Sequence, residues 1–402
     1  MEHWPLDRGV VFLNHGSFGG TPHAVLRAQD EFRRLMEREP VAFWVESFEG
    51  LLDTARQAMA RFVGCPPDDM AFIHNTTEGV NTVVRSLAWA PGDEILVNDH
   101  EYNACVNAAV HAASAAGAAV VTAKVPFPIS GPEVVLERTL AAVTARTRLA
   151  VISHVTSPTG LVLPVERLTR ELQSRGVDVL VDGAHAPAMV ELGVAQLGAA
   201  YYVGNFHKWL CAPKGSAFLY VRPDRQGRVA PLTVSHGLNS PRTDRSRFRL
   251  LFDYVGTVDP TPWLATPACV PFVSGLLPGG LPAMRDHNCA LALRGRDILA
   301  AAIGAEPPAP DAMLPFMASL PLPAHSPDRE ARLAARPTRY ADALQDRLVH
   351  HWGVQVPVWR MPALTPRPAR LIRISAQVYN TLDQYHYLAH ALSRELARER
   401  TL

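Results

Sequence analysis

The segment that decides the fold reads Val177-Asp178-Val179-Leu180-Val181-Asp182-Gly183-Ala184-His185, and it is followed by Ala199-Ala200-Tyr201-Tyr202-Val203-Gly204-Asn205-Phe206-His207-Lys208-Trp209. Each part opens with a largely apolar run, typical of a buried strand, and continues into polar residues. Asp182 closes the first run, and Lys208 comes shortly after the second. We interpret the two parts as strands that carry an acid and a lysine at or just beyond their ends.

Helical and strand patterns alternate around these segments, from about residue 50 to residue 222. Helices are expected over Gly50–Val63, Tyr102–Ala116 and Pro164–Gly176. Strands are expected over Glu94–Val97, Ala118–Val125, Leu149–His154, Val177–Val181, Ala199–Val203 and Ser216–Val221. This order predicts an α/β fold with a mostly parallel sheet buried on both faces. Because ligands bind beyond the carboxyl ends of such strands, we expect His154, Asp182 and Lys208 to meet in one crevice.

The sequence changes character after about residue 270. Residues 304–327 are rich in proline and predict a linker and loops, with one strand inside Met313–Leu320. A helix, a strand and a closing helix are expected over Arg336–Trp352, Leu371–Ser375 and Leu382–Arg398. We therefore expect an N-terminal segment near the site (1–20), a large domain (21–269) and a smaller C-terminal α+β domain (270–402). Val356–Pro368 contains four prolines and is predicted to be an ordered loop.

The composition of the chain limits the classes of partner that we expect. Hydrophobic residues make up 48% of the 402 residues and charged residues 19%, which fits a globular chain with a large core. The net charge of +1 gives no reason to expect a nucleic-acid partner or an acidic membrane surface. No apolar run approaches the roughly 18 residues of a membrane span, so no membrane association is expected.

The cysteines and the N-terminus indicate a cytoplasmic protein. Five cysteines are present, an odd number, and none forms a Cys-x-x-Cys pair. Neither a disulfide framework nor a metal site is therefore predicted. The first seven residues lack the basic and apolar regions of a signal peptide.

An acid that closes one strand and a lysine just after the next are what pyridoxal phosphate (PLP) chemistry requires. The lysine forms a Schiff base with the aldehyde, and the acid keeps the pyridine nitrogen protonated so that the ring can accept electrons. Asp182 could instead be a turn residue before Gly183, and Lys208 could be a surface lysine. The apolar flanks of Lys208 favour burial, and buried lysines are rare without a function. Of the two other lysines in the chain, Lys214 lies in a turn and is interpreted as structural.

Asn75-Thr76-Thr77-Glu78-Gly79 precedes another helical run and offers a phosphate site. A helix N-terminus presents free N–H groups and the positive end of a dipole to an anion. Alone, the motif could simply cap the helix. Together with Asp182 and Lys208, it predicts the phosphate end of a PLP site.

Three further side chains are candidates. His207 could contact the phosphate or be a core histidine. Tyr102 follows the Glu94–Val97 strand and could stack on the pyridine ring or belong to the core. Arg373 alternates with apolar residues in Leu371-Ile372-Arg373-Ile374, and an inward-pointing arginine is costly unless it meets an anion. Arg373 is therefore predicted to bind a substrate carboxylate, with a structural salt bridge as the alternative.

The chain resembles class V aminotransferase-fold PLP enzymes (fold type I), and among them the isopenicillin N epimerase-like branch. Seven segments carry the resemblance in the expected order: Leu13-Asn14-His15-Gly16-Ser17-Phe18-Gly19, Asn75-Thr76-Thr77, Ser153-His154-Val155-Thr156-Ser157-Pro158-Thr159-Gly160, Val181-Asp182-Gly183-Ala184-His185-Ala186-Pro187, His207-Lys208-Trp209-Leu210 with the following Ala-Pro-Lys-Gly, Gly256-Thr257 with Pro262-Trp263-Leu264-Ala265-Thr266-Pro267, and Arg373-Ile374-Ser375-Ala376-Gln377-Val378-Tyr379-Asn380-Thr381.

The resemblance implies a role for each matching position. Lys208, Asp182 and His185 would be the catalytic residues, with His185 near the ring oxygen. The other residues implied to bind the cofactor are Thr76, Thr77, Tyr102, Asn205, His207 and Thr257. Thr257 would reach the phosphate of a partner subunit, which implies a homodimer with shared active sites. The residues implied to bind the amino-acid substrate are Asn14, His15, Ser157 and Arg373.

One departure from the family pattern narrows the reaction. Relatives that are cysteine desulfurases place a nucleophilic cysteine on the loop before the final arginine strand. In this chain no cysteine follows Cys289. A desulfurase that forms a persulfide is therefore not expected.

Several reactions remain open after a PLP enzyme removes the Cα proton to give a quinonoid. Cleavage of a C–S bond by β-elimination needs only Lys208 as base and a good leaving group, whereas epimerisation also needs a second proton donor. We therefore favour a lyase that acts on a cysteine S-conjugate in a biosynthetic pathway. An epimerase of the isopenicillin N epimerase type, an aminotransferase and a decarboxylating deaminase are alternatives. A non-catalytic PLP-binding protein is a further alternative, against which the presence of both Lys208 and Asp182 argues.

Overall fold

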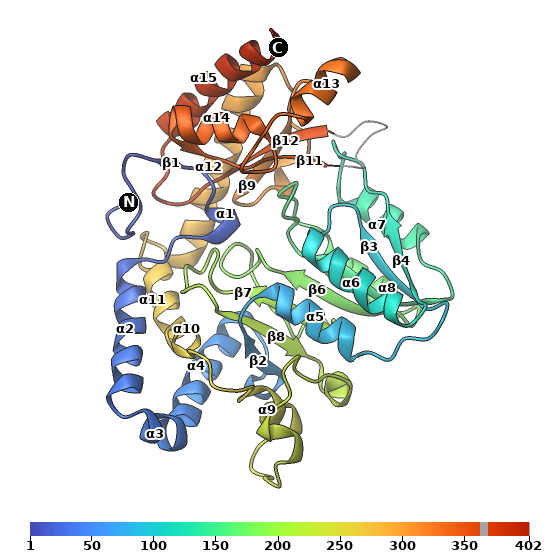
Figure 1. The fold of residues 1–402 in the computed structure, drawn as a ribbon, viewed down its shortest axis with the longest axis vertical. Helices are drawn as coiled ribbons and strands as arrows, with labels where there is room; N and C mark the ends of the chain where they lie inside the picture. The colour runs from blue at the N-terminus through green and yellow to red at the C-terminus, as the bar shows by residue number, and fades with distance from the viewer. Residues whose placement is uncertain (362–368, 402) are drawn as a thin grey trace.

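The computed structural model describes residues 1–361 and 369–401, and its centre is a seven-stranded sheet (Figure 1). The strand order is β2-β8-β7-β6-β5-β3-β4. Neighbours from β7 to β4 run parallel, whereas β8 runs antiparallel to both β7 and β2. The strands are β2 (Met70–Ile73), β3 (Glu94–Asn98), β4 (Ala119–Ala123), β5 (Thr147–Ser153), β6 (Asp178–Gly183), β7 (Tyr201–Asn205) and β8 (Ala217–Val221). The predicted α/β fold with a mostly parallel sheet is confirmed.

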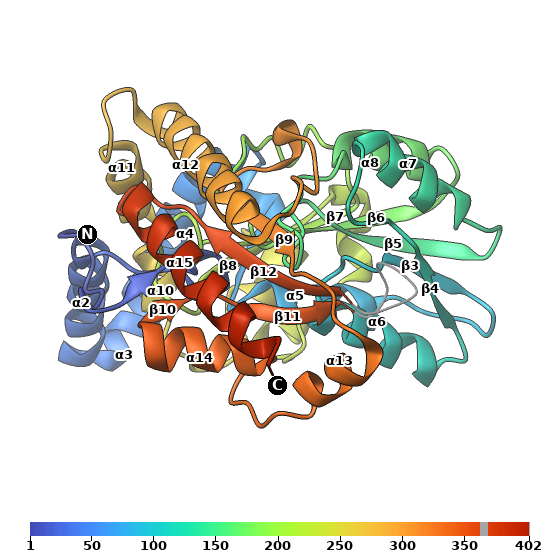
Figure 2. The same cartoon turned by 90° about the horizontal axis from the view of Figure 1, so that it is seen from above.

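Helices cover both faces of this sheet (Figure 2). One face is covered by α5 (Thr76–Ser86), α6 (Asn103–Ala115) and α9 (Arg247–Phe252), and the other by α4 (Phe48–Val63), α7 (Pro132–Ala141) and α8 (Val165–Gln173). Alternate residues of β6 belong to different cores: Val179 and Val181 to one, Leu180 to the other. The central strands are largely apolar because each side of the sheet is buried there.

A smaller antiparallel sheet lies above the large one in Figure 1. Its strand order is β11 (Val358–Met361), β12 (Ala369–Ser375), β9 (Met317–Pro321). The long helix α12 (Gly280–Ile303) packs against β9, β12 and α15. The remaining C-terminal helices are α13 (Pro327–Ala334), α14 (Ala343–Trp352) and α15 (Leu382–Glu399).

The N-terminal segment joins the smaller sheet to the large one. β1 (Val11–Phe12) pairs in parallel with β10 (Val354–Gln355), and the Ser375 N–H donates to the Leu13 carbonyl at 2.9 Å. The short helix α1 (His15–Phe18) then lies between the two sheets (Figure 1). The other helices are α2 (His23–Arg38), α3 (Pro40–Ala42), α10 (Thr261–Leu264) and α11 (Cys269–Ser274).

The elements predicted between residues 50 and 222 are all found, with ends that differ by at most four residues. The elements that were not predicted include β2, α2, α7 and α12. α14 begins at Ala343 rather than Arg336, because the Asp342 side chain caps it by accepting the Leu344 N–H at 3.0 Å.

The predicted loop over Val356–Pro368 is wrong in its first part, because Val358–Met361 pairs with β12 as the edge strand β11. Prolines are tolerated beside an edge strand, so Pro357 does not prevent pairing. Residues 362–368 of that predicted loop lie outside the described residues.

Two further features bear on the environment of the protein. Within the described residues, none of the helices combines the length and apolar character needed to cross a membrane. The five cysteines are free thiols.

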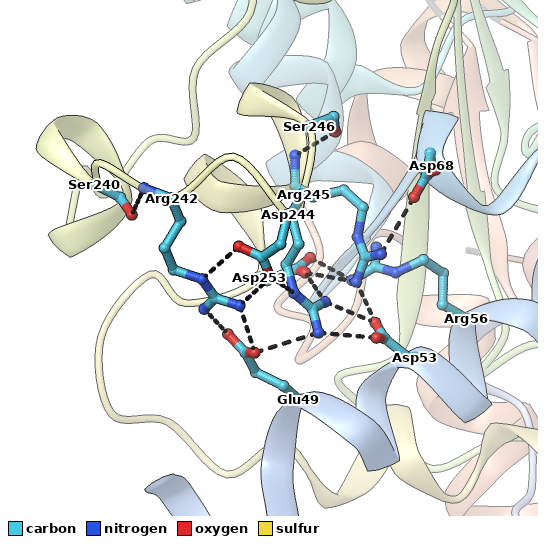
Figure 3. Close-up of polar contacts among 11 residues, drawn as sticks. Glu49, Asp53, Arg56, Asp68, Ser240, Arg242, Asp244, Arg245, Ser246 and Asp253 are labelled. Carbon is cyan, nitrogen blue, oxygen red and sulfur yellow. Dashed lines mark hydrogen bonds and ion pairs between the residues drawn. The ribbon is translucent and has the colours of Figure 1, made fainter. Parts of the chain in front are cut away.

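A network of ion pairs fastens α4 to the segment that contains α9 (Figure 3). Arg245 pairs with Asp53 at 2.9 Å, and Arg242 donates to Glu49 at 3.0 Å. Arg56 is 1% exposed and donates to both Asp253 and the Met70 carbonyl. The network thereby fixes the start of the chain segment that runs on to Thr257.

Replacement of Arg56 by alanine should destabilise the fold by about 3 kcal/mol, because removing one partner of a buried pair leaves the other uncompensated. Urea unfolding of the two proteins measures the difference. Arg167→Ala is the control, since the Arg167–Glu133 pair is exposed, and it should change stability little. Equal effects of the two substitutions would contradict the structural role of Arg56.

Candidate active site

Two cavities meet between the carboxyl ends of the parallel strands and the smaller sheet. The inner cavity has a volume of about 130 Å³ and the outer cavity about 500 Å³. The residues that line both are Ser17, Phe18, Tyr102, Ser157 and Lys208. The inner cavity also contains the predicted acid and the predicted phosphate-binding residues.

Asp182 lies near the end of β6 and is 2% exposed. Its Oδ1 accepts the Ala184 N–H at 2.9 Å, and its Oδ2 accepts the Cys105 S–H at 3.1 Å. Burial raises the pKa of this carboxyl group, and the charge of Lys208 opposes that rise. Asp182 is thus held in a fixed orientation at one end of the inner cavity.

Lys208 lies at the junction of the two cavities, and its Nζ is 3.0 Å from His185 Nε2. Burial lowers the pKa of Lys208 to about 8, although the charge of Asp182 acts in the opposite direction. About a tenth of this amine is therefore neutral at pH 7, far more than for an ordinary lysine, and a neutral amine is the nucleophilic form.

Trp209 fixes the tautomer of His185. The Trp209 indole N–H donates to His185 Nδ1 at 3.2 Å, and an indole nitrogen can only donate. Burial holds the pKa of His185 well below its usual value, so the ring is neutral and carries its proton on Nε2. His185 therefore presents an N–H donor to the inner cavity beside Lys208, as its predicted place near the ring oxygen requires.

The predicted phosphate-binding residues gather at the N-terminus of α5. The Thr76 N–H donates to Asn205 Oδ1 at 3.1 Å, and Asn205 Nδ2 donates to Thr76 Oγ1 at 3.3 Å. Thr77 and His207 also line the inner cavity. A helix of this length offers its N-terminal N–H groups to an anion.

The hydrogen bond made by His207 limits its role. Its Nδ1 is 3.0 Å from the Ser216 carbonyl, which can only accept, so Nδ1 carries the proton of the neutral ring. Burial lowers the pKa of His207 to about 4. His207 would therefore have to be protonated to donate to a phosphate through Nε2.

Arg373 projects from β12 to the outer cavity and is 2% exposed. Its guanidinium donates to Ser157 Oγ at 3.2 Å and to Ser17 Oγ at 3.2 Å, and it approaches Asn14 Oδ1 at 3.5 Å. It also lies over the Trp359 ring at 5.1 Å. Burial lowers the pKa of Arg373 to about 10.

Arg370, on the same strand, is a structural arginine and serves as a comparison for Arg373. It pairs with Asp342 at 2.9 Å and with Glu399 at 2.8 Å. Within residues 1–361 and 369–401, by contrast, no carboxylate pairs with Arg373. The structural salt bridge considered for Arg373 is therefore absent from this part of the chain, and its buried charge faces a cavity.

Three predicted residues lie elsewhere. His15 lies beneath Lys208, where its ring nitrogens contact Tyr379 Oη at 2.8 Å and the Lys208 carbonyl at 3.1 Å. Thr257 is exposed, 3.0 Å from Tyr254 Oη, and does not line either cavity of this single chain. The expectation for His154 was wrong, because its side chain lines a different cavity with Tyr202 and α8.

Several site residues were not predicted. Glu101 and Cys105 lie beside Asp182, and Trp209 and Trp359 hold His185 and Arg373. Glu101 follows the end of β3 just as Asp182 closes β6, and that shared position was an available signal. The tryptophan contacts join distant parts of the chain and leave no local signal.

The arrangement fits PLP. The inner cavity brings together an acid for the pyridine nitrogen (Asp182), a donor for the ring oxygen (His185), an amine for the aldehyde (Lys208) and the N-terminus of α5 for the phosphate. Tyr102, 47% exposed at the N-cap of α6, lines both cavities where a stacking residue is predicted.

The family model described as Aminotransferase class-V matches residues 14–249. The chain belongs to this family. Isopenicillin N epimerase from Amycolatopsis lactamdurans is 36% identical over 99% of this chain and 98% of its own length. Putative L-cysteine desulfhydrase 2 from Oryza sativa subsp. japonica is 30% identical over 97% of this chain and 85% of its own length.

Solved structures support the fold of this class-V family member. A complex of the cystine C-S lyase C-DES with its reaction product cysteine persulfide has a TM-score of 0.75 and 20% identity, and covers 96% of this chain and 98% of that chain. The protein is therefore a PLP-dependent enzyme of the class-V aminotransferase family.

Borohydride reduction of the holoenzyme should leave a pyridoxyl group on Lys208, which peptide mapping by mass detects. Because the pKa of Lys208 is lowered to about 8, covalent capture of PLP by the apoenzyme should rise with a midpoint near pH 8, as the amine loses its proton. Lys124→Ala is the control, since that side chain is exposed, and it should behave like the wild type. A label on Lys124 or Lys214 would contradict the assignment.

Proposed function

We propose that this enzyme cleaves the C–S bond of an S-substituted cysteine by β-elimination. The observation that carries the proposal is Lys208, a single amine with a pKa of about 8 placed where the inner cavity opens into a cavity of about 500 Å³. When bound, PLP supplies an electron sink that acidifies the Cα–H bond of an attached amino acid. With one molecule of water consumed, the products are a thiol, pyruvate and ammonia.

Each of the residues at the inner cavity has a separate proposed role. With PLP bound, Asp182 would hold the proton of the pyridine nitrogen, and the Nε2–H of His185 would donate to the ring oxygen. Lys208 would attach the cofactor through its amine and, when that amine is free, would accept the Cα proton of the substrate. Thr76, Thr77 and Asn205 would hold the phosphate, and Tyr102 would cover the ring.

Arg373 orients the substrate. Its guanidinium is buried without a carboxylate partner among the described residues, so a substrate carboxylate would neutralise it. Ser157 and Asn14 contact the same guanidinium and complete the carboxylate site. His15 supports the backbone of Lys208 from below and, at that position, is a positioning residue rather than a substrate contact.

The outer cavity is the place for the sulfur substituent. Its walls are largely apolar, formed by Phe18, Val97, Val106, Pro158, Pro357, Trp359 and Met361. A free cysteine thiol would leave most of about 500 Å³ unfilled. Burial of an apolar substituent would stabilise the bound substrate in proportion to its area. We therefore favour cysteine conjugates over cysteine itself.

Epimerisation is the second candidate, and the observation that favours it is the 36% identity to an isopenicillin N epimerase along almost the full length. Epimerisation requires proton return to the face opposite Lys208 from a second group. Elimination requires only Lys208 and a leaving group on Cβ. Because elimination requires fewer protein groups than epimerisation, the lyase remains the preferred assignment.

Incubation of the holoenzyme with a series of S-alkyl and S-aryl cysteines in deuterated water should yield pyruvate and the free thiol, with activity rising with substituent size. Arg373→Ala should raise KM by about 30-fold or more, because losing a charge-assisted pair with a desolvated partner costs roughly 2–5 kcal/mol. Lys208→Ala is the control for background elimination.

Mass and chiral analysis of the same samples separates the alternatives. Recovery of the inverted, deuterated amino acid without thiol would assign an epimerase. A 2-oxo acid that keeps its sulfur substituent would assign an aminotransferase, and an amine or aldehyde with release of carbon dioxide a decarboxylating enzyme.

The working unit is proposed to be a homodimer with shared sites. Thr257 lies on the surface away from both cavities, so the role implied by the family resemblance requires a second subunit. Phe18 lines both cavities and is nevertheless 76% exposed, which fits a site whose mouth is covered by another chain.

Mixing Lys208→Ala subunits with Thr257→Ala subunits, each impaired alone, should restore part of the activity. A hybrid dimer would carry one site with both lesions and one site with neither. Subunit exchange is verified by tagging one variant and isolating the mixed species. Activity of a monomer, or no rescue in a verified hybrid, would refute the shared site.

A further inference from the structure

A second buried carboxyl group lies beside Asp182. Glu101 follows β3, is 7% exposed and lines the outer cavity. Its Oε1 accepts the Ser153 O–H at 2.7 Å and the Tyr102 N–H at 2.8 Å, whereas Oε2 is buried without a partner. An unsatisfied buried carboxyl oxygen is costly, so its retention calls for a function.

Glu101, Asp182 and Cys105 form one buried cluster, in which Asp182 lines the inner cavity and Glu101 lines the outer cavity. A carboxylate oxygen of Glu101, a carboxylate oxygen of Asp182 and the sulfur of Cys105 all lie within 4.8 Å of one another. Asp182 already accepts hydrogen bonds from Ala184 and Cys105. The titratable groups facing Glu101 are Asp182 on β6 and Cys105 on α6, with Lys208 beyond Asp182.

Two buried carboxyl groups this close together cannot both ionise at low cost. Burial and the charge of Asp182 raise the pKa of Glu101 to about 8, so Glu101 holds a proton near pH 7. Burial also keeps the pKa of the Cys105 thiol well above its usual value, so Cys105 stays protonated.

We propose that Glu101 is a second acid of the cofactor site, which releases its proton when the pyridine ring of PLP binds against Asp182 and whose negative charge then helps to keep the ring nitrogen protonated. The inference rests on the proposed placement of the ring nitrogen at Asp182. A pyridinium ion there brings a positive charge to the carboxyl pair, and this charge favours ionisation of Glu101. The released proton passes to the ring nitrogen if that atom is bare and to solvent if it is not.

Proton counting on cofactor binding tests this step without measuring activity. Titration calorimetry of PLP into the apoenzyme, in buffers of different ionisation enthalpy near pH 7, gives the number of protons exchanged. The wild type should release about one proton more, or take up one fewer, than Glu101→Gln, because glutamine has no proton to give. The protonation state of free PLP is the same in both titrations and cancels in the comparison.

Cys105→Ala is the matched control. It removes the other side chain that faces Asp182, but Cys105 keeps its proton throughout, so this variant should match the wild type in the proton count. Glutamine retains the acceptor for Ser153 and Tyr102, so Glu101→Gln preserves those hydrogen bonds.

A second readout follows the ring nitrogen itself. With ¹⁵N-labelled PLP, the nitrogen chemical shift should report loss of the ring proton at a pH at least one unit lower in Glu101→Gln than in the wild type. The Glu101 role is overturned if wild type and Glu101→Gln exchange equal numbers of protons and titrate alike while PLP is bound to Lys208. If PLP does not bind to Lys208 at all, the proposed placement of the pyridine ring is refuted, and the proposed role of Glu101, which depends on it, is refuted as well.

Discussion

The site depends on the parallel pairing of β6 with β7. This pairing aligns Leu180 with Tyr201 and Gly183 with Gly204, so both strands end at the same edge. Asp182 therefore lies within β6 close to this edge, and Lys208 lies on the chain that continues past the end of β7 at the same edge. The acid and the amine reach one cavity because two strands of the same direction end together.

The aligned glycines show how tightly this pairing is packed. A Cβ on Gly183 would lie 2.3 Å from the Tyr202 hydroxyl, and one on Gly204 would lie 2.4 Å from the Phe218 ring. Aromatic side chains of neighbouring strands thus occupy the space beside these glycines. A side chain at Gly183 would press against Tyr202 of β7, and one at Gly204 would press against Phe218 of β8, so either would displace a strand that positions Asp182 or Lys208.

The sequence predicted the features that depend on local pattern. Apolar runs between helices marked the strands, and Asp182 and Lys208 were found because they lie at or just beyond strand ends. The direction of a side chain is harder to predict, since neighbouring residues in a strand face opposite sides. Ser153 and Val155 line the inner cavity, whereas His154 between them faces another cavity. A histidine at the correct strand end was therefore assigned to the wrong side.

Long-range contacts could not be predicted from the sequence for a different reason. Ionisation of Glu101 depends on its distance from Asp182, 81 positions later in the chain, and on the absence of a partner for one of its oxygens. The surroundings of Arg373 likewise differ from those of Arg370 in a way that the local sequence does not show. Residues on alternate faces of one strand meet different surroundings, and here one meets two carboxylates while the other meets a cavity.

The proposed elimination and the alternative epimerisation would share the inner cavity and differ outside it. Removal of a Cα proton by Lys208 would serve both reactions, so the acid–lysine pair does not distinguish them. The outer cavity would decide which substituent lies on Cβ and which group can return a proton. Its walls come partly from β11, with Trp359 and Met361, and partly from the ends of β3 and α6, with Val97 and Val106. Because the smaller sheet and the large sheet each contribute a wall, the shape of the space between them would determine the step that follows proton removal in the proposed mechanism.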